Sequence, residues 1–299
     1  MENQPKTFEE EEPLQYHESP MPGKYTVKCI KPMNNAKDLS LAYSPGVAVP
    51  CLEIARDPEL VYKYTNKGNM VAVISNGTAV LGLGNLGPLG AKPVMEGKAV
   101  LFNKFAGVES IDLCIDAKTP EEIIACVKCL APSFAGINLE DIKAPDCFIV
   151  EEALKKMMNI PVFHDDQHGT AIVTLAGFIN GCHITGRKVE DCKVVLNGAG
   201  AAGIACIKLL HRYGVRKENI TICDTKGVVY AGRTAGMNQW KEEFANATTT
   251  ARTLQEALVG ADCFVGVSAP NVIDRHDVAK MSKKPLIFAM ANPVPEIDP

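Results

Sequence analysis

The sequence predicts an α/β fold of two domains: an N-terminal α/β substrate and metal domain, then a Rossmann-like domain with a parallel sheet that binds a dinucleotide. Three observations support this. The chain has 299 residues, enough for two domains that each bury a core. From Met70 onward, short apolar segments alternate with amphipathic ones. A glycine-rich turn near residue 200 stands between a strand pattern and a helix pattern.

The composition is that of an ordinary globular protein. The chain is 46% hydrophobic and 22% charged, with a formal net charge of -4. This balance provides no general electrostatic attraction for nucleic acid or anionic membranes. The longest apolar runs, such as residues 171–179, are far shorter than the roughly 20 residues of a membrane span. We therefore expect neither nucleic acid nor a membrane as a partner.

Residues 1–23 are polar and carry four prolines, so we expect a loose arm or an oligomer contact. The acidic run from Glu9 to Glu12 is unlike a secretory signal or a transit peptide, which predicts a cytoplasmic protein. The 11 cysteines are scattered through apolar stretches without metal-site spacing. We expect them to be reduced residues of the core.

The first domain is predicted at residues 24–163. Apolar segments at 71–75, 79–84, 96–102 and 110–116 predict its strands. Residues 120–130 predict an amphipathic helix with acidic residues in its first turn.

The second domain is predicted at residues 164–299, after a boundary near 161–169. A helix at 170–181 is expected first. A strand ending at Asn197, a helix at 204–214 and a strand at 219–224 then form a β-α-β unit. Farther along the chain, we expect a helix at 253–258 and strands at 263–267 and 286–290.

The glycine turn of this β-α-β unit predicts a dinucleotide site. Gly198, Gly200 and Gly203 give G-x-G-x-x-G, and Asp224 ends the next strand 24 residues after Gly200. The glycines permit a tight turn and close approach of the backbone to pyrophosphate, which faces the helix N-terminus. Asp224 favours NAD because its charge repels a 2'-phosphate, whereas Lys226 partly offsets that repulsion. The choice between NAD and NADP stays open.

A second G-x-G-x-x-G match occurs at Gly82, Gly84 and Gly87. Pro88 and Pro93 follow it, which disfavours a long helix. This match predicts either a tight bend at a substrate cleft or a purely structural turn. The nearby residues 90–92 lack the G-K-[ST] ending, which excludes a nucleoside triphosphate loop.

Two acidic doublets are candidates for chemistry: Glu140 with Asp141, and Asp165 with Asp166. Adjacent side chains on a strand face opposite ways, so a doublet serves one site fully only from a loop or a helix start. Three carboxylates that converge there would bind Mg²⁺ or Mn²⁺ through oxygen. Solvated acids of a turn are the alternative.

The basic and aromatic candidates each have a structural alternative. His164 and His168 are four apart, but an expected loop and helix start argue against a zinc pair and favour satisfied or exposed histidines. Lys98, at the edge of a predicted strand, either extends to solvent or lines a cleft beside a cation, where a lowered pKa would make it a general base. Tyr43 precedes a Ser-Pro-Gly turn and either covers a core edge or serves the site.

An ordered set of motifs spans nearly the whole chain from about residue 16 and resembles the small, bacterial-type malic enzymes. The motifs are D-L-S-L-A-Y-S-P-G-V-A (38–48), L-G-L-G-N-L-G-P (81–88), P-V-M-E-G-K-A-V-L-F (93–102), I-N-L-E-D-I (137–142), P-V-F-H-D-D-Q-H-G-T-A (161–171), N-G-A-G-A-A-G (197–203), G-V-S-A-P (266–270) and A-N-P-V-P-E-I (291–297). The resemblance implies a homodimer or higher homo-oligomer that oxidises L-malate with NAD or NADP and decarboxylates the product to pyruvate and carbon dioxide.

The resemblance also implies roles for single residues. Lys98 matches the general base, Tyr43 the general acid, and Asp165 a carboxylate that pairs with the lysine. The matching metal ligands are Glu140, Asp141 and Asp166. The matching cofactor-binding residues are Asn197, Gly198, Ala199, Gly200, Ala201, Ala202, Gly203, Asp224, Ser268 and Asn292. Asn292 also matches a residue that touches substrate.

The sequence departs from the family pattern in two places. Asn103 stands where these enzymes often carry lysine, a surface change. The chain stops at Pro299, where the family continues, so we expect a C-terminally incomplete chain. Two other interpretations remain: a catalytically silent module for NAD(P) binding or assembly, and another two-domain nicotinamide enzyme, such as an amino acid dehydrogenase, that needs no divalent cation.

Overall fold

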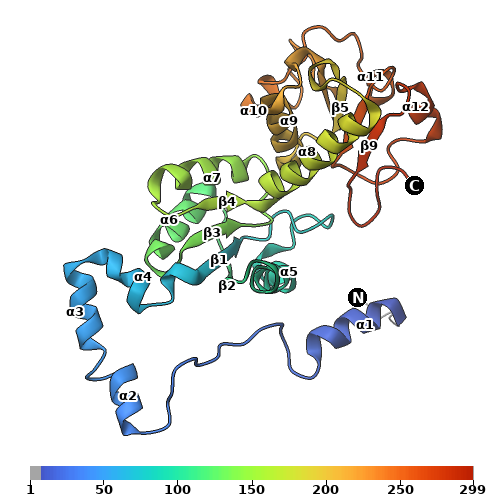
Figure 1. Cartoon of the computed structure of the whole chain (residues 1–299). Helices are drawn as coiled ribbons and strands as arrows, with labels where there is room; N and C mark the ends of the chain where they lie inside the picture. The colour runs from blue at the N-terminus through green and yellow to red at the C-terminus, as the bar shows by residue number, and fades with distance from the viewer. Residues whose placement is uncertain (1–7, 299) are drawn as a thin grey trace. The chain divides into compact units, whose positions relative to one another are not determined.

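The computed structural model describes residues 8–298 of the chain (Figure 1). Residues 1–7 of the predicted arm lie outside the described residues. The chain forms two compact units. The first unit comprises Met1–Gly77, Gly87–Asn138 and Ala153–Val162, and the second comprises Thr78–Leu86, Leu139–Glu152 and Phe163–Pro299. The sequence prediction placed one boundary near residues 161–169, whereas this division also assigns two earlier segments to the second unit.

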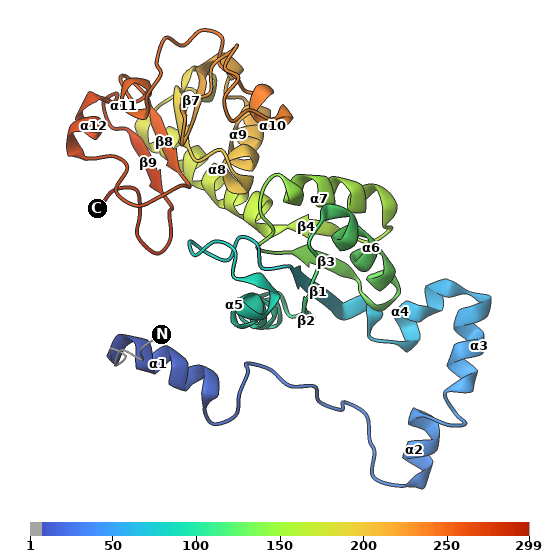
Figure 2. The same cartoon turned by 180° about the vertical axis from the view of Figure 1, so that it is seen from behind.

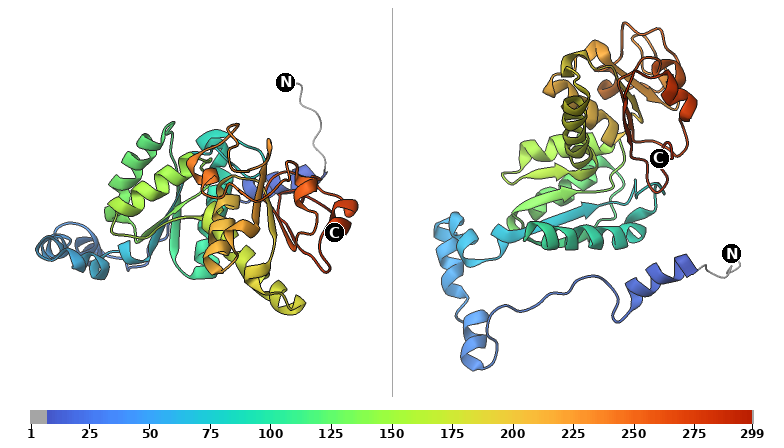
Figure 3. Two further views of the ribbon diagram at one scale, coloured as in Figure 1. Left: turned by 90° about the horizontal axis from the view of Figure 1, so that it is seen from above. Right: turned by 45° about the vertical axis from the view of Figure 1, so that its right-hand side comes forward.

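The first unit begins with an extended stretch of short helices. These are α1 (Phe8–Glu18), α2 (Ala36–Ala42), α3 (Ala48–Arg56) and α4 (Val61–Tyr64). None of residues 11–66 is buried, and Lys67 is the first buried residue in the part of the chain whose burial is described. Figures 1 and 3 show α2 and α3 standing away from the first sheet. This stretch therefore contributes nothing to the core of its own unit.

The first sheet has four strands in the order β2-β1-β3-β4. Their bounds are β1 (Met70–Ser75), β2 (Glu109–Cys114), β3 (Gly136–Leu139) and β4 (Val162–His164). β1 and β2 are parallel, with Met70 opposite Glu109 and Ser75 opposite Cys114. The predicted helix at 120–130 is confirmed as α6 (Pro120–Leu130), which begins with a capping box between Thr119 and Glu122. α7 (Asp146–Met157) follows β3.

Two predictions for residues 79–102 were wrong. Residues 79–84 are not a strand but a tight turn, closed by a hydrogen bond from the Val80 amide to the Gly84 carbonyl at 2.9 Å. Residues 96–102 are not a strand either, because α5 (Gly87–Leu101) extends through them and carries Lys98 in its last turn.

The two prolines of α5 explain why the sequence was misread. Pro88 occupies the first turn, where a missing amide costs nothing. Pro93 leaves the Leu89 carbonyl without its helical donor, but Leu89 is 89% exposed, so water can serve that oxygen. The buried face of α5, formed by Ala91, Met95 and Ala99 at intervals of one turn, packs on β1 and β2.

The second unit contains a five-stranded sheet in the order β7-β6-β5-β8-β9. Its strands are β5 (Val194–Asn197), β6 (Ile220–Asp224), β7 (Gly227–Val228), β8 (Cys263–Gly266) and β9 (Leu286–Ala289). β6, β5, β8 and β9 are parallel, and β7 alone runs antiparallel to β6. The expected Rossmann-like parallel sheet is therefore present.

Helices cover both faces of this sheet (Figures 1 and 2). They are α8 (Asp165–Thr185), α9 (Ala201–Tyr213), α10 (Gln239–Glu242), α11 (Leu254–Ala257) and α12 (Arg275–Lys280). α8 packs against α9. A Cβ at Gly177 would lie 2.7 Å from the Phe288 ring, so glycine allows α8 to approach β9. On the other face, Val195 and Phe264 pack with residues of α11 and α12 in one apolar cluster.

The remaining short helical turns are η1 (Pro58–Leu60), η2 (Lys67–Asn69), η3 (Phe102–Ala106), η4 (Ala131–Ser133), η5 (Val189–Asp191) and η6 (Lys217–Asn219), of which η3 is π-helical. Among the described helices, none is both long and apolar enough to cross a bilayer.

All 11 cysteines are free thiols, as expected, but only some belong to the core. The buried ones are Cys147, Cys182, Cys192, Cys206, Cys223 and Cys263. Cys29, Cys51 and Cys129 are exposed, so the prediction that the cysteines are core residues was wrong for these three.

Candidate functional site

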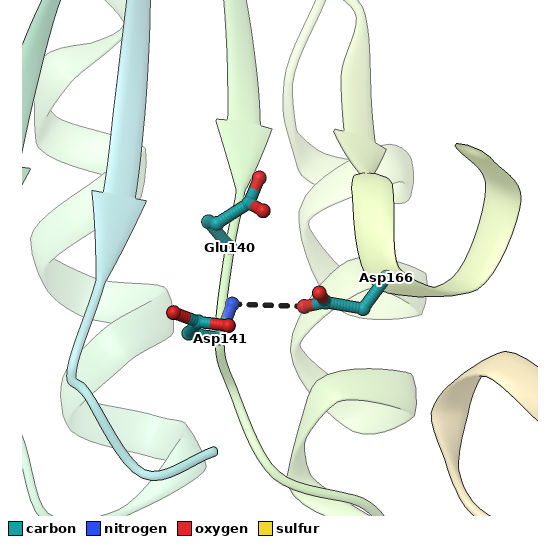
Figure 4. Close-up of side chains that lie close together, drawn as sticks. All are labelled: Glu140, Asp141 and Asp166. Carbon is teal, nitrogen blue, oxygen red and sulfur yellow. Dashed lines mark hydrogen bonds between the residues drawn. The ribbon is translucent and has the colours of Figure 1, made fainter. Parts of the chain in front are cut away.

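The three carboxylates predicted as metal ligands lie together (Figure 4). Glu140 and Asp141 follow β3 directly, and Asp166 lies in the first turn of α8, directly after β4. One oxygen of each lies within 4.8 Å of the others. Glu140 is 5% exposed and Asp141 4%, so their charges are largely removed from water. Because two buried carboxylates and one half-buried carboxylate repel one another, this oxygen donor set fits a hard divalent cation.

The backbone at Asp141 fixes this arrangement. Asp141 has a φ of +54°, in the left-handed region that aspartate tolerates better than most residues. Its amide donates a hydrogen bond to Oδ2 of Asp166 at 2.8 Å, drawn in Figure 4. Its carbonyl accepts one from the Ala79 amide at 3.0 Å. Both acidic doublets therefore lie where the prediction required, after a strand end and at a helix start.

Glu151 is a positioning residue that the sequence analysis missed. It lies on α7 and is 4% exposed. Its carboxylate accepts hydrogen bonds from the His164 amide at 3.1 Å and the Gln167 side chain at 3.4 Å, and it contacts Nε2 of His168 at 2.7 Å. A carboxylate is favourable at this helix N-terminus, and it holds the turn that carries Asp166.

A signal for Glu151 was present in the sequence. Cys147, Val150 and Leu154 are buried and share the helical stripe of Glu151 at the i-4, i-1 and i+3 positions. A glutamate on an apolar stripe needs a buried partner.

His164 differs from its prediction as a satisfied or exposed histidine. Its ring is fully buried, and neither ring nitrogen makes a hydrogen bond with any described residue. Nε2 lies 3.5 Å from Oδ2 of Asp166. Burial lowers the pKa of His164, although Asp166 acts in the opposite direction.

The remaining candidate catalytic residues are divided between the units. Asp165 is the first residue of α8 in the second unit. Its carboxylate lies against Gly169, and a Cβ at residue 169 would collide with that carboxylate. Lys98 is half-buried on α5 in the first unit. Tyr43, also in the first unit, directly follows α2 and is 77% exposed. The structure thus groups the metal ligands and leaves Tyr43 largely exposed.

The glycine turn at Gly198 has the geometry predicted for a dinucleotide site. Gly198 has a φ of +113°, and a Cβ there would lie 2.5 Å from the Val267 carbonyl oxygen. A Cβ at Gly203 would collide with the Gly198 carbonyl oxygen, so α9 approaches the turn only because residue 203 is glycine. Nothing lies within 4 Å of a Cβ at Gly200, which caps α9. Ala201 and Ala202 form the first turn of α9.

A pocket of about 540 Å³ opens at this turn. Its predicted lining residues are Asn197, Gly198, Ala199, Gly200, Asp224 and Ser268, joined by Thr225, Lys241, Leu254, Gln255, Ala269 and Val272. The volume and the bare glycine turn fit a dinucleotide.

Asp224 is held by two cations that the sequence analysis did not identify. Its Oδ2 accepts hydrogen bonds from Arg233 at 2.5 Å and Lys241 at 2.7 Å. Lys226, the residue expected to offset its charge, donates its backbone amide to Oδ1 at 2.8 Å. Burial raises the pKa of Asp224, but the hydrogen bonds from Arg233 and Lys241 outweigh burial and hold that pKa below its ordinary value.

A further residue that the sequence analysis missed, Glu296, joins the loops around the pocket. It is fully buried and accepts hydrogen bonds from the Ser268 amide at 2.8 Å and the Ala291 amide at 2.9 Å. Ser268 in turn accepts a hydrogen bond from the Asn197 side chain at 2.7 Å. Asn292 lies beside Gly82, where a Cβ would be 2.5 Å from the Asn292 carbonyl oxygen. Glu296 stands inside the quoted motif at 291–297, but no spacing rule pointed to it.

Comparison with known proteins matches both halves of the chain. The model for the malic enzyme N-terminal domain matches residues 22–122, and that for the malic enzyme NAD binding domain matches residues 167–298. A probable NADP-dependent malic enzyme of Rickettsia prowazekii is 60% identical over 96% of this chain, and the chain spans 37% of its length. The NADP-dependent malic enzyme of Halomonas elongata is 56% identical, with 96% of this chain and 67% of that protein covered.

A solved structure agrees with these sequence matches. The crystal structure of malic enzyme from Pyrococcus horikoshii has a TM-score of 0.91 and 42% identity, with 97% of this chain and 70% of that chain covered.

Proposed function

The chain belongs to the malic enzyme family, and on this premise we propose that the full-length protein oxidises L-malate with a nicotinamide cofactor and releases pyruvate and carbon dioxide. The observation that carries the proposal is the convergence of Glu140, Asp141 and Asp166 within 4.8 Å, in a chain that also has a dinucleotide-type pocket. A homodimer or higher homo-oligomer, expected from the family resemblance, and a cytoplasmic location, expected from the sequence, are further predictions.

We assign the divalent cation, Mg²⁺ or Mn²⁺, to the three carboxylates. When bound, the cation acidifies the C2 hydroxyl of malate and polarises the C2 carbonyl of the oxidised product. Glu151 and the Asp141 amide hold the ligands in place, so the site is largely formed before the ion arrives.

Three further side chains complete the proposed chemistry. The Lys98 amine takes the proton of the C2 hydroxyl as hydride leaves C2 for the cofactor. By the family resemblance, Asp165 serves as the carboxylate that keeps this amine oriented. After the C4 carboxylate leaves as carbon dioxide, the Tyr43 hydroxyl protonates C3 to give pyruvate.

The ion cluster at Asp224 supports NADP as the preferred cofactor. One carboxylate is matched with two cations, Arg233 and Lys241, both in contact with Oδ2. The excess positive charge at the end of β6 attracts a 2'-phosphate, whereas a lone aspartate would repel one. The relatives from Rickettsia and Halomonas are named as NADP-dependent, which is consistent with this assignment.

The metal assignment is tested on the full-length protein and on this chain. Glu140→Gln and Asp141→Asn should weaken Mn²⁺ binding at least 100-fold, as measured by calorimetry, and abolish malate-dependent NADP reduction. EDTA should have the same effect on the wild type. Asp116→Asn, which removes an acid that is 74% exposed, is the matched control and should change neither. Mn²⁺ binding that survives both ligand substitutions would refute the assignment.

The cofactor assignment is tested by Lys241→Ala. Loss of one of two cations should lower kcat/KM for NADP by about 10-fold or more and leave that for NAD nearly unchanged. Lys280→Ala, at a half-exposed lysine on α12, is the control. An equal loss with both cofactors would mean that Lys241 only stabilises the fold.

A further inference from the structure

The two cations at Asp224 are held in different ways. The Arg233 side chain is 4% exposed, and besides Asp224 it donates to the carbonyls of Gly227 and Val228, both at 3.1 Å. The Lys241 side chain is 15% exposed, and of the two cations it alone lines the pocket at the glycine turn. Lys241 is therefore the cation that a bound cofactor would meet.

The helix that carries Lys241 is too short to be stable by itself. α10 is a single turn of 4 residues, and an isolated helix of that length does not persist in water. The Asn238 side chain caps the turn by accepting a hydrogen bond from the Lys241 amide at 3.0 Å. This cap shapes the turn locally but does not attach it to the rest of the unit. The attachment must come from a side chain that α10 buries.

Trp240 provides this attachment. It directly precedes Lys241 and is the one buried residue of α10. Its ring packs on the ring of Phe148, which lies on α7, with the ring centroids 4.7 Å apart and an angle of 36° between the planes. Phe148 is also buried, so the contact excludes water. Aromatic pairs at such distances stabilise a fold beyond the area that they bury, so the pair attaches α10 to α7.

The buried ring sets the direction of the lysine beside it. Adjacent residues of an α-helix point about 100° apart, because one turn has 3.6 residues. With Trp240 directed at α7, Lys241 is directed at the end of β6. There its amine donates to Oδ2 of Asp224 at 2.7 Å and to the Gly236 carbonyl at 2.8 Å. A turn that lost its contact with α7 could rotate and carry the amine away from this position.

The helix that receives Trp240 is itself fixed. Phe148 and Glu151 are three positions apart on α7, which places them on the same side of that helix. Glu151 accepts a hydrogen bond from the His164 amide at 3.1 Å and contacts Nε2 of His168 at 2.7 Å. These contacts do not involve the cofactor pocket. α7 therefore supports α10 whether or not a cofactor is bound.

We propose that Trp240 is a positioning residue for cofactor choice: packed on Phe148, it holds the Lys241 amine where that amine meets the 2'-phosphate of NADP. The inference deepens the proposed function and rests on its cofactor assignment. NAD has a hydroxyl in place of this phosphate, so a displaced Lys241 weakens the binding of NADP far more than that of NAD. Trp240 is not among the described residues that line the pocket, so its effect is exerted through Lys241.

Calorimetric titration of the full-length protein with NADP and with NAD tests the proposal. Trp240→Ala should weaken NADP binding by about 10-fold or more and NAD binding by less than about 2-fold, as should Lys241→Ala. Trp240→Phe, which keeps a ring against Phe148, should retain most of the NADP affinity. Phe134→Leu, at a buried ring of the first unit, is the matched control for lost packing and should leave the ratio of the two affinities unchanged.

A double variant distinguishes action through the lysine from a direct role of the tryptophan. If Trp240 acts by positioning Lys241, its removal has no further effect once the lysine is gone. Trp240→Ala combined with Lys241→Ala should then bind NADP within about 2-fold of Lys241→Ala alone. If the two losses multiply instead, Trp240 acts on the cofactor independently of Lys241, and the inference is overturned.

A change to the partner ring keeps the proposal testable if Trp240→Ala does not fold. Phe148→Leu leaves an apolar side chain on α7 but removes the packed ring, so it should lower the preference for NADP in the same direction. Trp240 is the only tryptophan of this chain, so acrylamide quenching of its fluorescence should increase when its ring is released. A released ring with an unchanged preference for NADP would overturn the inference.

The outcomes separate this inference from the proposed function. If Lys241→Ala lowers the preference for NADP but Trp240→Ala and Phe148→Leu do not, the positioning role alone is refuted. If Lys241→Ala has no selective effect, the cofactor assignment is wrong and the inference falls with it. Malate turnover enters none of these measurements, so its absence would count against the proposed reaction alone.

Discussion

The turn at Gly82, Gly84 and Gly87 and the turn at Gly198, Gly200 and Gly203 follow the same G-x-G-x-x-G spacing, but their glycines have different surroundings. At the second turn, a Cβ on Gly198 or Gly203 would strike the backbone of the turn itself or of the loop after β8. At the first turn, a Cβ on Gly84 or Gly87 would meet nothing within 4 Å.

This difference shows that the G-x-G-x-x-G spacing does not specify the structural role of each glycine. Gly84 and Gly87 have φ values of +81° and +72°, so glycine serves only the backbone conformation there. Gly203 serves close packing of α9 on the turn, and Gly200 leaves open space at the pocket. Only the turn at Gly198, Gly200 and Gly203 combines a close-packed helix start with an open surface for a phosphate.

The largest effect on stability is expected for Gly203→Ala. The new methyl group would collide with the Gly198 carbonyl, and the backbone cannot yield without moving α9. We expect a loss of about 2–4 kcal/mol in the free energy of unfolding, together with loss of cofactor binding. Urea unfolding and calorimetric titration with NADP measure both. A variant that retains cofactor affinity would disprove the role of close packing.

Gly82→Ala should have the next largest effect. Its methyl group would lie 2.5 Å from the Asn292 carbonyl oxygen. We expect a cost of about 1–3 kcal/mol, and a rise in KM for malate that is larger than the loss of NADP affinity, because the displaced Asn292 matches a residue that touches both substrate and cofactor. If the cofactor affinity falls as much as the malate affinity, the two turns serve one site and the comparison fails.

Gly84→Ala isolates the conformational cost at the first turn. With open space around the methyl group, only the left-handed backbone is penalised, by about 1–2 kcal/mol. Asparagine, which tolerates this conformation better, should restore part of the loss. A much larger loss measured by urea unfolding would indicate a contact that the described residues do not account for.

The smallest effect on stability is expected for Gly200→Ala. Nothing obstructs its methyl group, and its φ of -90° suits any residue. The thermal midpoint should therefore remain within about 1–2 °C of the wild type. NADP affinity should nevertheless fall at least 10-fold, because the methyl group occupies the space that pyrophosphate needs. Unchanged affinity would place the phosphate elsewhere.

The sequence was sufficient to predict a structural element where the residues that define the element are close together in the chain. The strand, glycine turn and helix around Gly198 form a local unit, so spacing alone predicted it. The acidic doublets were also placed correctly at a strand end and a helix start. For α5, apolar residues after Lys98 looked like a strand because the small residues on its buried face, Ala91 and Ala99, give a weak helical pattern.

The missed residues depend on contacts between distant segments. Arg233 and Lys241 reach Asp224 from 9 and 17 positions away, after a turn whose path the sequence does not encode locally. Glu296 joins the loop after β8 to the segment after β9 by side-chain hydrogen bonds, and no periodic pattern marks such a residue.

The uneven distribution of thiols has a practical consequence. Burial raises the pKa of Cys147 to about 12 and that of Cys206 to about 11, so both are protonated and shielded at neutral pH. Cys29 and Cys51 are exposed and lie within residues 26–66. After Cys126 and Cys129 on α6 are replaced by serine, a maleimide dye or a nitroxide should label this region selectively. Fluorescence or electron paramagnetic resonance can then follow its motion at native positions.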